Sequence, residues 1–312
     1  VCVENHPEGV FVQFSKNYGC DCGISVCGPY DENGEFHVEY YFPFFRGTGI
    51  TSREKVTVER HTEKESYAGA CDDLRIGVKG IYQNWTMKLE MGYAGNKATI
   101  KDAFATYSYK NSSIQIGQFY EPFSLDMLCS TFDLRFNQSP GAVLALTNSR
   151  RMGAAYSYNK KHYYLCAGFF TDNDLSNLKN VSQGYAIDGR LVYRPLYEKG
   201  KLVHVGLAGI YRTPDGVSTD DENKDTFTYK SPGVSTIDNR TLVFADVDNA
   251  TSQLKIGAEF LFYYQKLFLQ SEYIRTHVKR KEGYNHYTAQ GAYVQCSWLL
   301  LGQNYLYDEE VA

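Results

Sequence analysis

The stretch Arg75–Tyr93 reads RIGVKGIYQNWTMKLEMGY and contains two strand-length runs, Arg75–Tyr82 and Asn84–Tyr93, joined by almost nothing. Alternate residues of a β-strand point to opposite faces, so each run can be divided into two faces. One face of the two runs carries Ile76, Val78, Gly80 and Tyr82, then Trp85, Met87, Leu89, Met91 and Tyr93. The other carries Arg75, Gly77, Lys79 and Ile81, then Asn84, Thr86, Lys88, Glu90 and Gly92. The pattern predicts a hairpin with one apolar and one polar face.

The same pattern of strand-length runs continues to the end of the chain. Further candidate strands are Thr99–Tyr109, Ser112–Phe119, Arg150–Asn159, His162–Phe170, Tyr185–Arg194, Lys201–Arg212, Gln253–Gln265, Leu267–Val278 and Tyr287–Leu301. Short turns alternate with longer connections, which are Glu121–Ser149, Thr171–Gly184, Thr213–Arg240 and Lys279–His286. This asymmetry is typical of an outer-membrane β-barrel, and the polar stretch Thr213–Arg240 is expected to be an extracellular loop.

The apolar faces of six of these runs contain no charged residue. Their aromatic residues gather at the strand ends, as Tyr82, Tyr93, Tyr158, Tyr193, Tyr211 and Tyr264. That arrangement is typical of the aromatic girdles at the two membrane interfaces. A soluble β-sandwich also has alternating strands and is the alternative, but these runs reach about ten residues, longer than the usual five or six. The sequence therefore favours an all-β, transmembrane antiparallel barrel.

Composition agrees with this fold class. The chain has 312 residues, of which 43% are hydrophobic and 22% charged, so it is not a disordered chain. It has no apolar run of about 18 residues, which excludes transmembrane helices. A mean hydropathy of −0.42 together with 15% aromatic residues suits a barrel in which alternate residues face lipid. The net charge of −4 argues against a nucleic-acid partner.

The polar faces have an excess of positive charge. They carry the candidate pore-lining cations Arg75, Lys79, Lys88, Arg151, Arg190, Arg194, Arg212 and Lys255, against the anions Glu90, Asp188 and Glu259. Rings of charged side chains set the sign of the ion that passes a pore. The polar faces therefore predict a water-filled channel that prefers small anions.

Residues 1–70 form a divergent, cysteine-bearing segment that includes the candidate strand Phe36–Phe45. Eight cysteines suit an oxidising compartment. The spacing of Cys20, Cys22 and Cys27, with Cys71 further on, could hold zinc, but it is not a standard zinc motif, and disulfides or free thiols are the alternative. We expect no metal and no cofactor. Cys166 and Cys296 lie in strand-like runs and are expected to pack.

No enzyme signature is present. The chain has no P-loop, no G-x-S-x-G and no H-E-x-x-H. A Ser/His pair on one strand face cannot be assembled, so a barrel enzyme is the weakest alternative. The sequence predicts a protein that is not an enzyme.

Four segments resemble the phosphate-selective porin O/P family: Ile100–Tyr107, Ile114–Asp126, Asn148–Ala154 and Gly291–Gln303. The motif Gly117-Gln118-Phe119, followed by Glu121-Pro122-Phe123, is the most specific of these. The resemblance implies a trimeric outer-membrane barrel of about sixteen strands in a Gram-negative bacterium. It also implies that the third loop, residues 120–149, folds inward and narrows the pore. Where family members carry an acidic residue and an arginine in this loop, the chain reads Arg135–Ser139, RFNQS.

The predicted organisation is therefore an N-terminal segment, 1–70, and a barrel, 71–312, which is incomplete at its C-terminus because no closing strand ends in an aromatic residue. The apolar side chains of the loop 120–149 should pack on the inner wall and leave Arg135, Arg150 and Arg151 near the constriction. Expected partners are outer-membrane lipid and small anions such as phosphate, with a homotrimer or other outer-membrane proteins as the assembly. The alternative function is a non-conducting barrel that serves as a structural subunit of a larger outer-membrane complex.

Overall fold

The computed structural model describes residues 11–14, 21–22, 24–27, 37–47, 71–94, 97–129, 134–136, 138–176, 183–215, 225–232, 241–300, 305 and 307. The chain divides into two compact units. Unit 1 comprises Val1–Ala103 and Ser235–Asn239, and unit 2 comprises Phe104–Val234 and Arg240–Ala312. Strand β7 (Lys97–Tyr109) contributes residues to both units.

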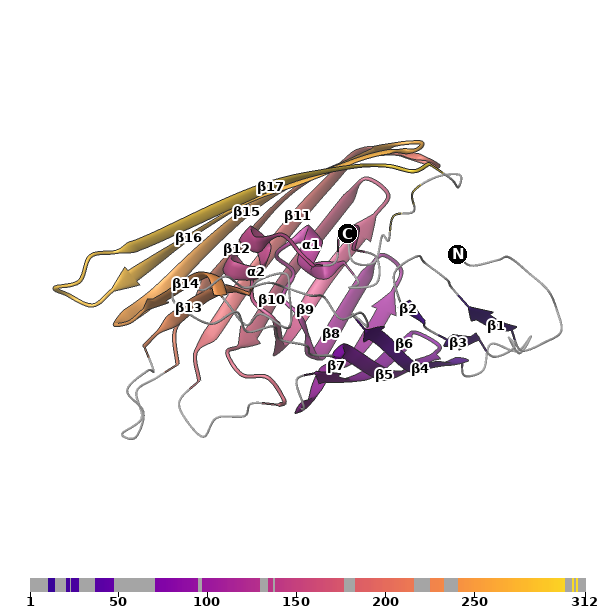
Figure 1. Cartoon of the computed structure of the whole chain (residues 1–312), viewed down its shortest axis with the longest axis horizontal. Helices are drawn as coiled ribbons and strands as arrows, with labels where there is room; N and C mark the ends of the chain where they lie inside the picture. Colours follow the sequence, from indigo (N-terminus) through magenta and orange to yellow (C-terminus); the bar gives the residue numbers. More distant parts are fainter. Residues whose placement is uncertain are drawn as a thin grey trace, which may run out of the picture. The chain divides into compact units, whose positions relative to one another are not determined.

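Unit 1 is built from antiparallel strands (Figure 1). Its strands are β1 (Phe11–Phe14), β2 (Asp21–Cys22), β3 (Ile24–Cys27), β4 (His37–Gly47), β5 (Cys71–Tyr82), β6 (Trp85–Ala94) and the first part of β7. The hairpin predicted from Arg75–Tyr93 consists of β5 and β6, in which Tyr82 pairs with Trp85. Gln83 in the turn has a positive φ of 52°, as a tight two-residue hairpin turn requires. The strand expected at Phe36–Phe45 is β4.

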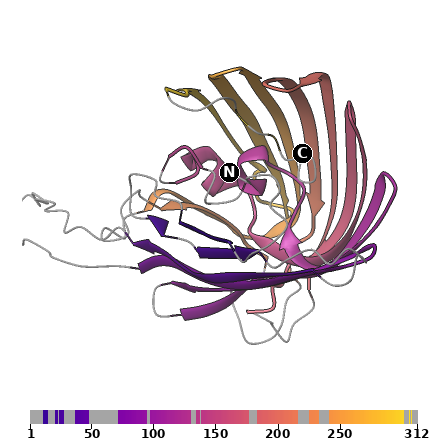
Figure 2. The ribbon, with the colours of Figure 1, turned by 90° about the vertical axis from the view of Figure 1, so that its right-hand side faces the viewer.

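Unit 2 contains one large antiparallel wall with strand order β8-β9-β10-β11-β12-β15-β16-β17. These strands are β8 (Ser112–Tyr120), β9 (Arg150–Lys160), β10 (Tyr163–Thr171), β11 (Tyr185–Glu198), β12 (Lys201–Arg212), β15 (Ala250–Tyr264), β16 (Leu267–Arg280) and β17 (Tyr287–Trp298). Figure 2 shows the wall curving around two short helices, α1 (Leu125–Leu128) and α2 (Gly141–Leu146). Among the described strands β17 pairs only with β16, so the wall is open at that edge.

The connections of unit 2 divide by length between the two ends of the wall. Two-residue turns join β9 to β10, β11 to β12 and β15 to β16, with Gly200 and Gln265 at positive φ. Longer connections lie at the other end, after β8, β10 and β12. The predicted fold class is therefore confirmed: an all-β, barrel-type antiparallel wall whose third loop lies on its concave side. The strands of the described residues do not close into a ring.

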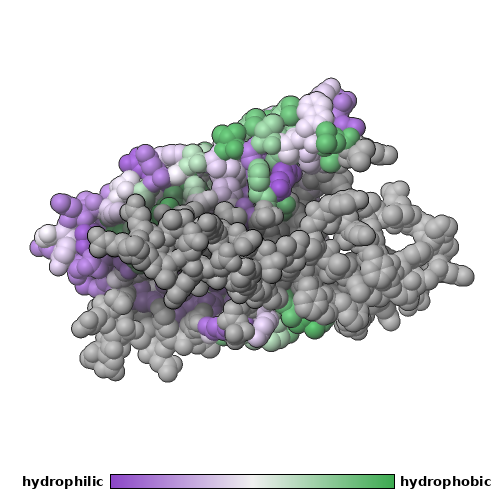
Figure 3. All heavy atoms as spheres, viewed as in Figure 1, coloured by the Kyte–Doolittle hydropathy of each residue, from purple (hydrophilic) through white to green (hydrophobic). Residues whose placement is uncertain are grey.

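The two faces of the wall are inverted relative to a water-soluble protein. Ile187 and Leu207 are 54% and 57% exposed, whereas Arg194 and Lys255 are 0% and 2% exposed. In water this arrangement would leave a large apolar surface solvated and would bury charge. In Figure 3 hydrophilic residues gather at the end of unit 2 where β16 and β17 are joined, and hydrophobic residues lie further along the strands. The inverted faces indicate that the apolar side contacts lipid.

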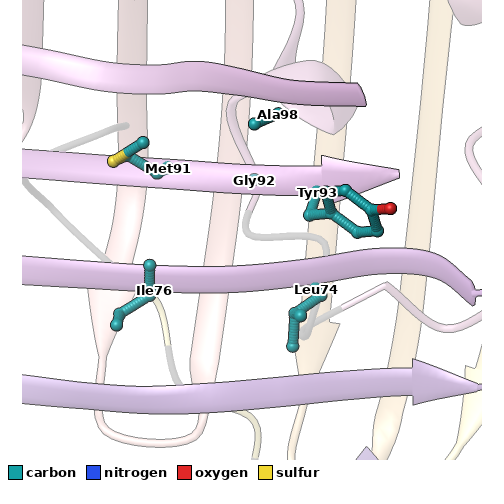
Figure 4. Close-up of a pocket in the computed structure, with 6 residues that line it drawn as sticks. All are labelled: Leu74, Ile76, Met91, Gly92, Tyr93 and Ala98. Carbon is teal, nitrogen blue, oxygen red and sulfur yellow. The ribbon is translucent and has the colours of Figure 1, made fainter. Parts of the chain in front are cut away.

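The exposed face of unit 1 has the same apolar character. Between β5, β6 and β7 lies a shallow hollow lined by Leu74, Ile76, Met91, Gly92, Tyr93 and Ala98 (Figure 4). No helix within the described ranges is long and apolar enough to cross a membrane.

One connection between wall strands differs from the sequence prediction. The stretch Thr213–Arg240, expected as an extracellular loop, contains strand β13 (Phe227–Pro232), which pairs with β14 (Thr241–Val247) in a separate two-stranded sheet. The Tyr229 hydroxyl lies 3.0 Å from the Thr276 hydroxyl and accepts a 2.6 Å hydrogen bond from Gln253. The buried Phe227 and Tyr229 explain the strand, because they alternate in an otherwise polar segment and give the hairpin an apolar face.

Candidate functional site

The candidate site lies on the concave face of unit 2, where the loop 120–149 is anchored to the wall. A single buried carboxylate, Glu272 of β16, holds the start of α1. It accepts hydrogen bonds from the Ser124 hydroxyl at 2.8 Å and from the backbone N–H groups of Leu125 at 3.1 Å and Asp126 at 2.8 Å. The Tyr293 hydroxyl donates a fourth, at 2.6 Å. The first turn of a helix has unpaired N–H groups, so this carboxylate caps the helix from outside.

Apolar side chains of the loop also pack on the wall. Phe123 is buried, and its ring lies 3.2 Å from where a Cβ of Gly257 would stand. Helix α2 packs against Gly291 of β17, where a Cβ would lie 2.8 Å from the Cβ of Ala142. Val143 in the same helix has no exposed surface. The glycines of β15 and β17 thus make room for the loop, because the side chains of the loop pack directly on the strand backbone there.

The two ends of the loop meet in a polar network, which we call the loop-base cluster: Glu121, Asn148, Arg151, Asp172, Arg212 and Lys255. Arg212 of β12 forms ion pairs with both Glu121 and Asp172. Asn148 donates to Glu121 at 2.6 Å and accepts from the Lys255 ammonium at 2.8 Å. Arg151 lies 3.6 Å from Asp172. The cluster therefore ties the start and the end of the loop to β9, β12 and β15.

A second group of charges lies on β11, β12 and β15. Glu259 accepts a hydrogen bond from Arg190 Nε at 3.0 Å and forms an ion pair with Nη2 at 2.8 Å, although the two residues are 69 positions apart in sequence. The His204 Nε2 lies 3.0 Å from the same carboxylate oxygen, and its Nδ1 lies 2.7 Å from the Tyr307 hydroxyl. Gly206 leaves room for Glu259, because a Cβ there would lie 2.1 Å from its oxygen.

Two further candidate cations are held by neutral groups. Arg194 donates to the Asn159 side chain at 2.6 Å and to the Lys160 carbonyl at 2.5 Å. Arg135, in the loop, lies with its guanidinium carbon 3.2 Å from the centre of the Phe268 ring, which is a cation–π contact. Burial lowers the pKa of the Arg135 guanidinium, and it raises the pKa of the Asp126 carboxyl against the opposing charge of Arg135.

Arg150 and Arg151 were predicted to lie together at the constriction, but they point to opposite faces of β9. Arg151 faces Asp172 on the concave side. Arg150 pairs with Tyr120 across the β8–β9 ladder, lies 4.1 Å above its ring and donates to its hydroxyl at 2.9 Å. Successive residues of a strand alternate between faces, so only one of two adjacent arginines can face the loop.

The remaining candidate cations belong to unit 1, on one face of β5 and β6. Arg75 forms an ion pair with Glu90 at 3.2 Å. Lys88 pairs with Glu90 at 3.0 Å and with Asp102 at 2.6 Å. Lys79 lies directly opposite Lys88 in the register. The structure thus places Lys88 between two carboxylates.

Several carboxylates of the site were missed in the sequence. They are Glu121, Asp126, Asp172, Asp215 and Glu272, and all but Asp172 are buried in the structure. Four of these lie in connections between strands, where no alternation assigns a side chain to either face. Glu272 lies in a strand, but the residues of that strand were not divided between the two faces from the sequence. Together with Asp188 and Glu259 they make seven carboxylates, against the six candidate cations of this site, Arg135, Arg151, Arg190, Arg194, Arg212 and Lys255. The excess of cations expected from the strands alone is therefore not present among these described residues.

The two cysteines in the wall strands differ in exposure. Cys166 is buried on the concave face, as a packing residue would be, whereas Cys296 on β17 is exposed. The expectation that both residues pack is wrong for Cys296, because it lies on the outward face of the strand next to Trp298. The side chains of Cys20, Cys22, Cys27 and Cys71 lie outside the described residues.

Comparison with known families gives two matches. The family model described as phosphate-selective porin O and P matches residues 61–312. A model for a domain of unknown function, described from an E. rectale gene, matches residues 1–110. No curated protein matches the chain.

Proposed function

Because this chain belongs to the phosphate-selective porin O and P family, an outer-membrane porin family, we propose that it forms a water-filled channel for small anions, with phosphate among them. The observation that carries the proposal is the concave face of unit 2. There, cations from β9, β12 and β15 converge on the base of the loop 120–149, while the opposite face of the same strands is apolar. Charged side chains enclosed between a wall and a loop are stable where water or an oppositely charged group contacts them.

Within the loop-base cluster, Lys255 is the residue that we assign to the passing anion. Its ammonium donates to the neutral Asn148 oxygen at 2.8 Å, so an anion can take that place without displacing a carboxylate. Arg151 faces Asp172 at a longer distance of 3.6 Å and can turn its planar fork to the same anion. Several weak sites in series let an ion enter and leave again.

The many ion pairs on this face predict that the channel prefers anions over cations only weakly. Arg212 is shared by two carboxylates, and Arg190 is paired with Glu259. A cation already neutralised by a neighbouring carboxylate adds little to the field that a passing ion meets. We therefore infer an anion preference that a single substitution can abolish or strengthen.

The test is the reversal potential of the purified chain in a planar bilayer under a tenfold KCl gradient. The wild-type chain should give the anion-selective sign. Lys255→Gln should reduce the chloride-to-potassium permeability ratio, and more so at about 0.01 M than at 1 M salt, where the Debye length falls from about 30 to 3 Å. Lys161→Gln, at the exposed β9–β10 turn, is the control with the same charge change. A cation-selective wild-type pore, or equal effects of the two substitutions, would contradict the proposal.

A non-conducting barrel that serves as a structural subunit is the second candidate. It is favoured by the near-complete burial of Arg190, Arg194, His204 and also Lys255, which leaves these groups little contact with a passing ion. Reconstituted protein without conductance steps, together with stoichiometric co-purification of another outer-membrane protein, would support this candidate over the channel.

A further inference from the structure

The outward face of β16 differs from that of its neighbouring strands. Along the strand, Ile274, Thr276 and Val278 are buried on the concave side. The residues between them therefore point outward. Arg275 and Lys279 are exposed there, and His277 is half-buried between them. By contrast, the apolar faces of the six strand-length runs described above carry no charged residue.

These basic side chains lie beside an apolar surface. In the register with β15, Arg275 is opposite Ile256 and His277 is opposite Leu254, and both apolar side chains are about half exposed. On the other side, Arg275 is opposite Gln290 of β17. The patch of Arg275, His277 and Lys279, which we call the outer cationic patch, therefore borders the surface that contacts lipid.

Protein carboxylates do not account for the outer cationic patch. Among the residues that the structure describes, Arg275 and Lys279 have no carboxylate within ion-pair distance, and His277 contacts the Thr288 hydroxyl at 2.9 Å. The next two cations along the chain differ, because Arg280 is paired with Asp248 and Lys281 with Asp225. The patch thus presents unpaired positive charge outward.

The position of the patch along β16 matches the edge of a bilayer. The outward face carries Leu267 and Leu269 near the two-residue turn, then Tyr273, and only then Arg275. At about 3.4 Å per residue, Leu267 to Arg275 spans about 27 Å along the strand. A tilt of about 40° reduces this to about 21 Å, close to the 25 Å apolar band of a membrane barrel. Arg275 therefore lies near the edge of the apolar band, and Lys279, four residues further along the strand, lies past it, at the end with the long connections.

We propose that the outer cationic patch binds the phosphate groups of an anionic glycolipid in the outer leaflet around the barrel. Long basic side chains reach from an apolar surface to the headgroup level, and charge-assisted hydrogen bonds to phosphate favour arginine and lysine there. Long connections are extracellular in outer-membrane barrels, so the patch faces the outer leaflet. The inference uses the membrane placement behind the proposed function and is independent of conduction.

The experiment titrates the purified full chain in detergent with bisphosphorylated lipid A and counts bound lipids by native mass spectrometry. The test variant is Arg275→Gln/Lys279→Gln. The matched control is Lys160→Gln/Lys161→Gln, which removes two charges at the opposite end of the wall. Each basic residue near an anionic surface contributes about 1 kcal/mol, which is about fivefold in affinity, so the test variant should bind about 30-fold more weakly. Arg275→Lys/Lys279→Arg should retain binding.

Three results would overturn the proposal. One is equal affinity of the wild-type chain and the test variant. Another is equally tight binding of lipid A from which both phosphates have been removed. The third is a change of oligomeric state in the test variant with unchanged lipid binding, which would assign the patch to a second copy of the chain. If the double variant does not fold, Lys279→Gln near the strand end replaces it, with about a fivefold loss expected. A silent bilayer recording would refute conduction and leave these affinities unaffected.

Discussion

Replacing Glu272 by glutamine should release the loop 120–149 from the wall. The carboxylate accepts two hydrogen bonds at each oxygen: from the Ser124 hydroxyl and the Leu125 N–H at one, and from the Asp126 N–H and the Tyr293 hydroxyl at the other. A glutamine side chain has a single acceptor oxygen. The hydroxyls can rotate to accept from its amide, but a backbone N–H cannot, so one of the two backbone donors loses its partner.

The cost follows from these contacts. An unsatisfied buried donor costs about 1–3 kcal/mol, and hydrogen bonds to a charged group are about 1 kcal/mol stronger than those to a neutral one. We take about 3 kcal/mol for the whole change, which raises the population of the detached loop start by about 100-fold. The native loop keeps its other contacts on β15 and β17, so the wall itself should remain folded.

Amide hydrogen exchange measures this opening directly. The Leu128 and Cys129 N–H groups donate within α1 to Ser124 and Leu125 at 3.1 and 3.2 Å, and their exchange should accelerate by about 100-fold in Glu272→Gln. Glu198→Gln, an exposed carboxylate at the two-residue turn end of β11, is the control and should leave these amides unchanged. Exchange in Glu272→Gln that stays within threefold of the wild-type rate would refute the capping role.

Further predictions concern glycines that make room for side chains. Gly291→Ala places a methyl 2.8 Å from the Cβ of Ala142 and should destabilise the packing of α2 by about 1–3 kcal/mol, measured as a lower unfolding temperature. Gly206→Ala places a methyl 2.1 Å from the Glu259 oxygen, so it should break the buried ion pair and destabilise by about 3 kcal/mol or more. Gly189→Ala meets nothing within 4 Å and should behave like the wild type; equal melting of all three variants would show that this packing is wrong.

The fold could be predicted because its signal is local and periodic. The alternation in Arg75–Tyr93 assigned both faces of β5 and β6, and the short turn between the two runs fixed the register of that hairpin. The same alternation placed Arg190, Arg194 and Lys255 on one face, and these residues lie together on the concave side. Strand periodicity requires no knowledge of the partner strand.

The charge balance of the site could not be predicted in the same way. Glu121 and Asp172 lie just past the ends of strands, where no period assigns a direction, yet both reach Arg212. The pairing of Arg190 with Glu259 depends on the order of strands in the wall and spans 69 positions. Arg150 was misplaced because both arginines of the motif Asn148–Ala154 were assigned to one location, whereas adjacent residues of the strand point in opposite directions.

The measurement that tests the central claim most directly is quenching of the native tryptophan fluorescence. The chain has two tryptophans. Trp85 and Trp298 are 43% and 64% exposed on the apolar face, each beside a two-residue turn. In vesicles of brominated phosphatidylcholine, we predict strong quenching by bromines near the top of the acyl chain, weaker quenching by bromines near its end, and little quenching by aqueous iodide. Strong iodide quenching without any effect of brominated lipid would contradict the assignment of this face to the membrane.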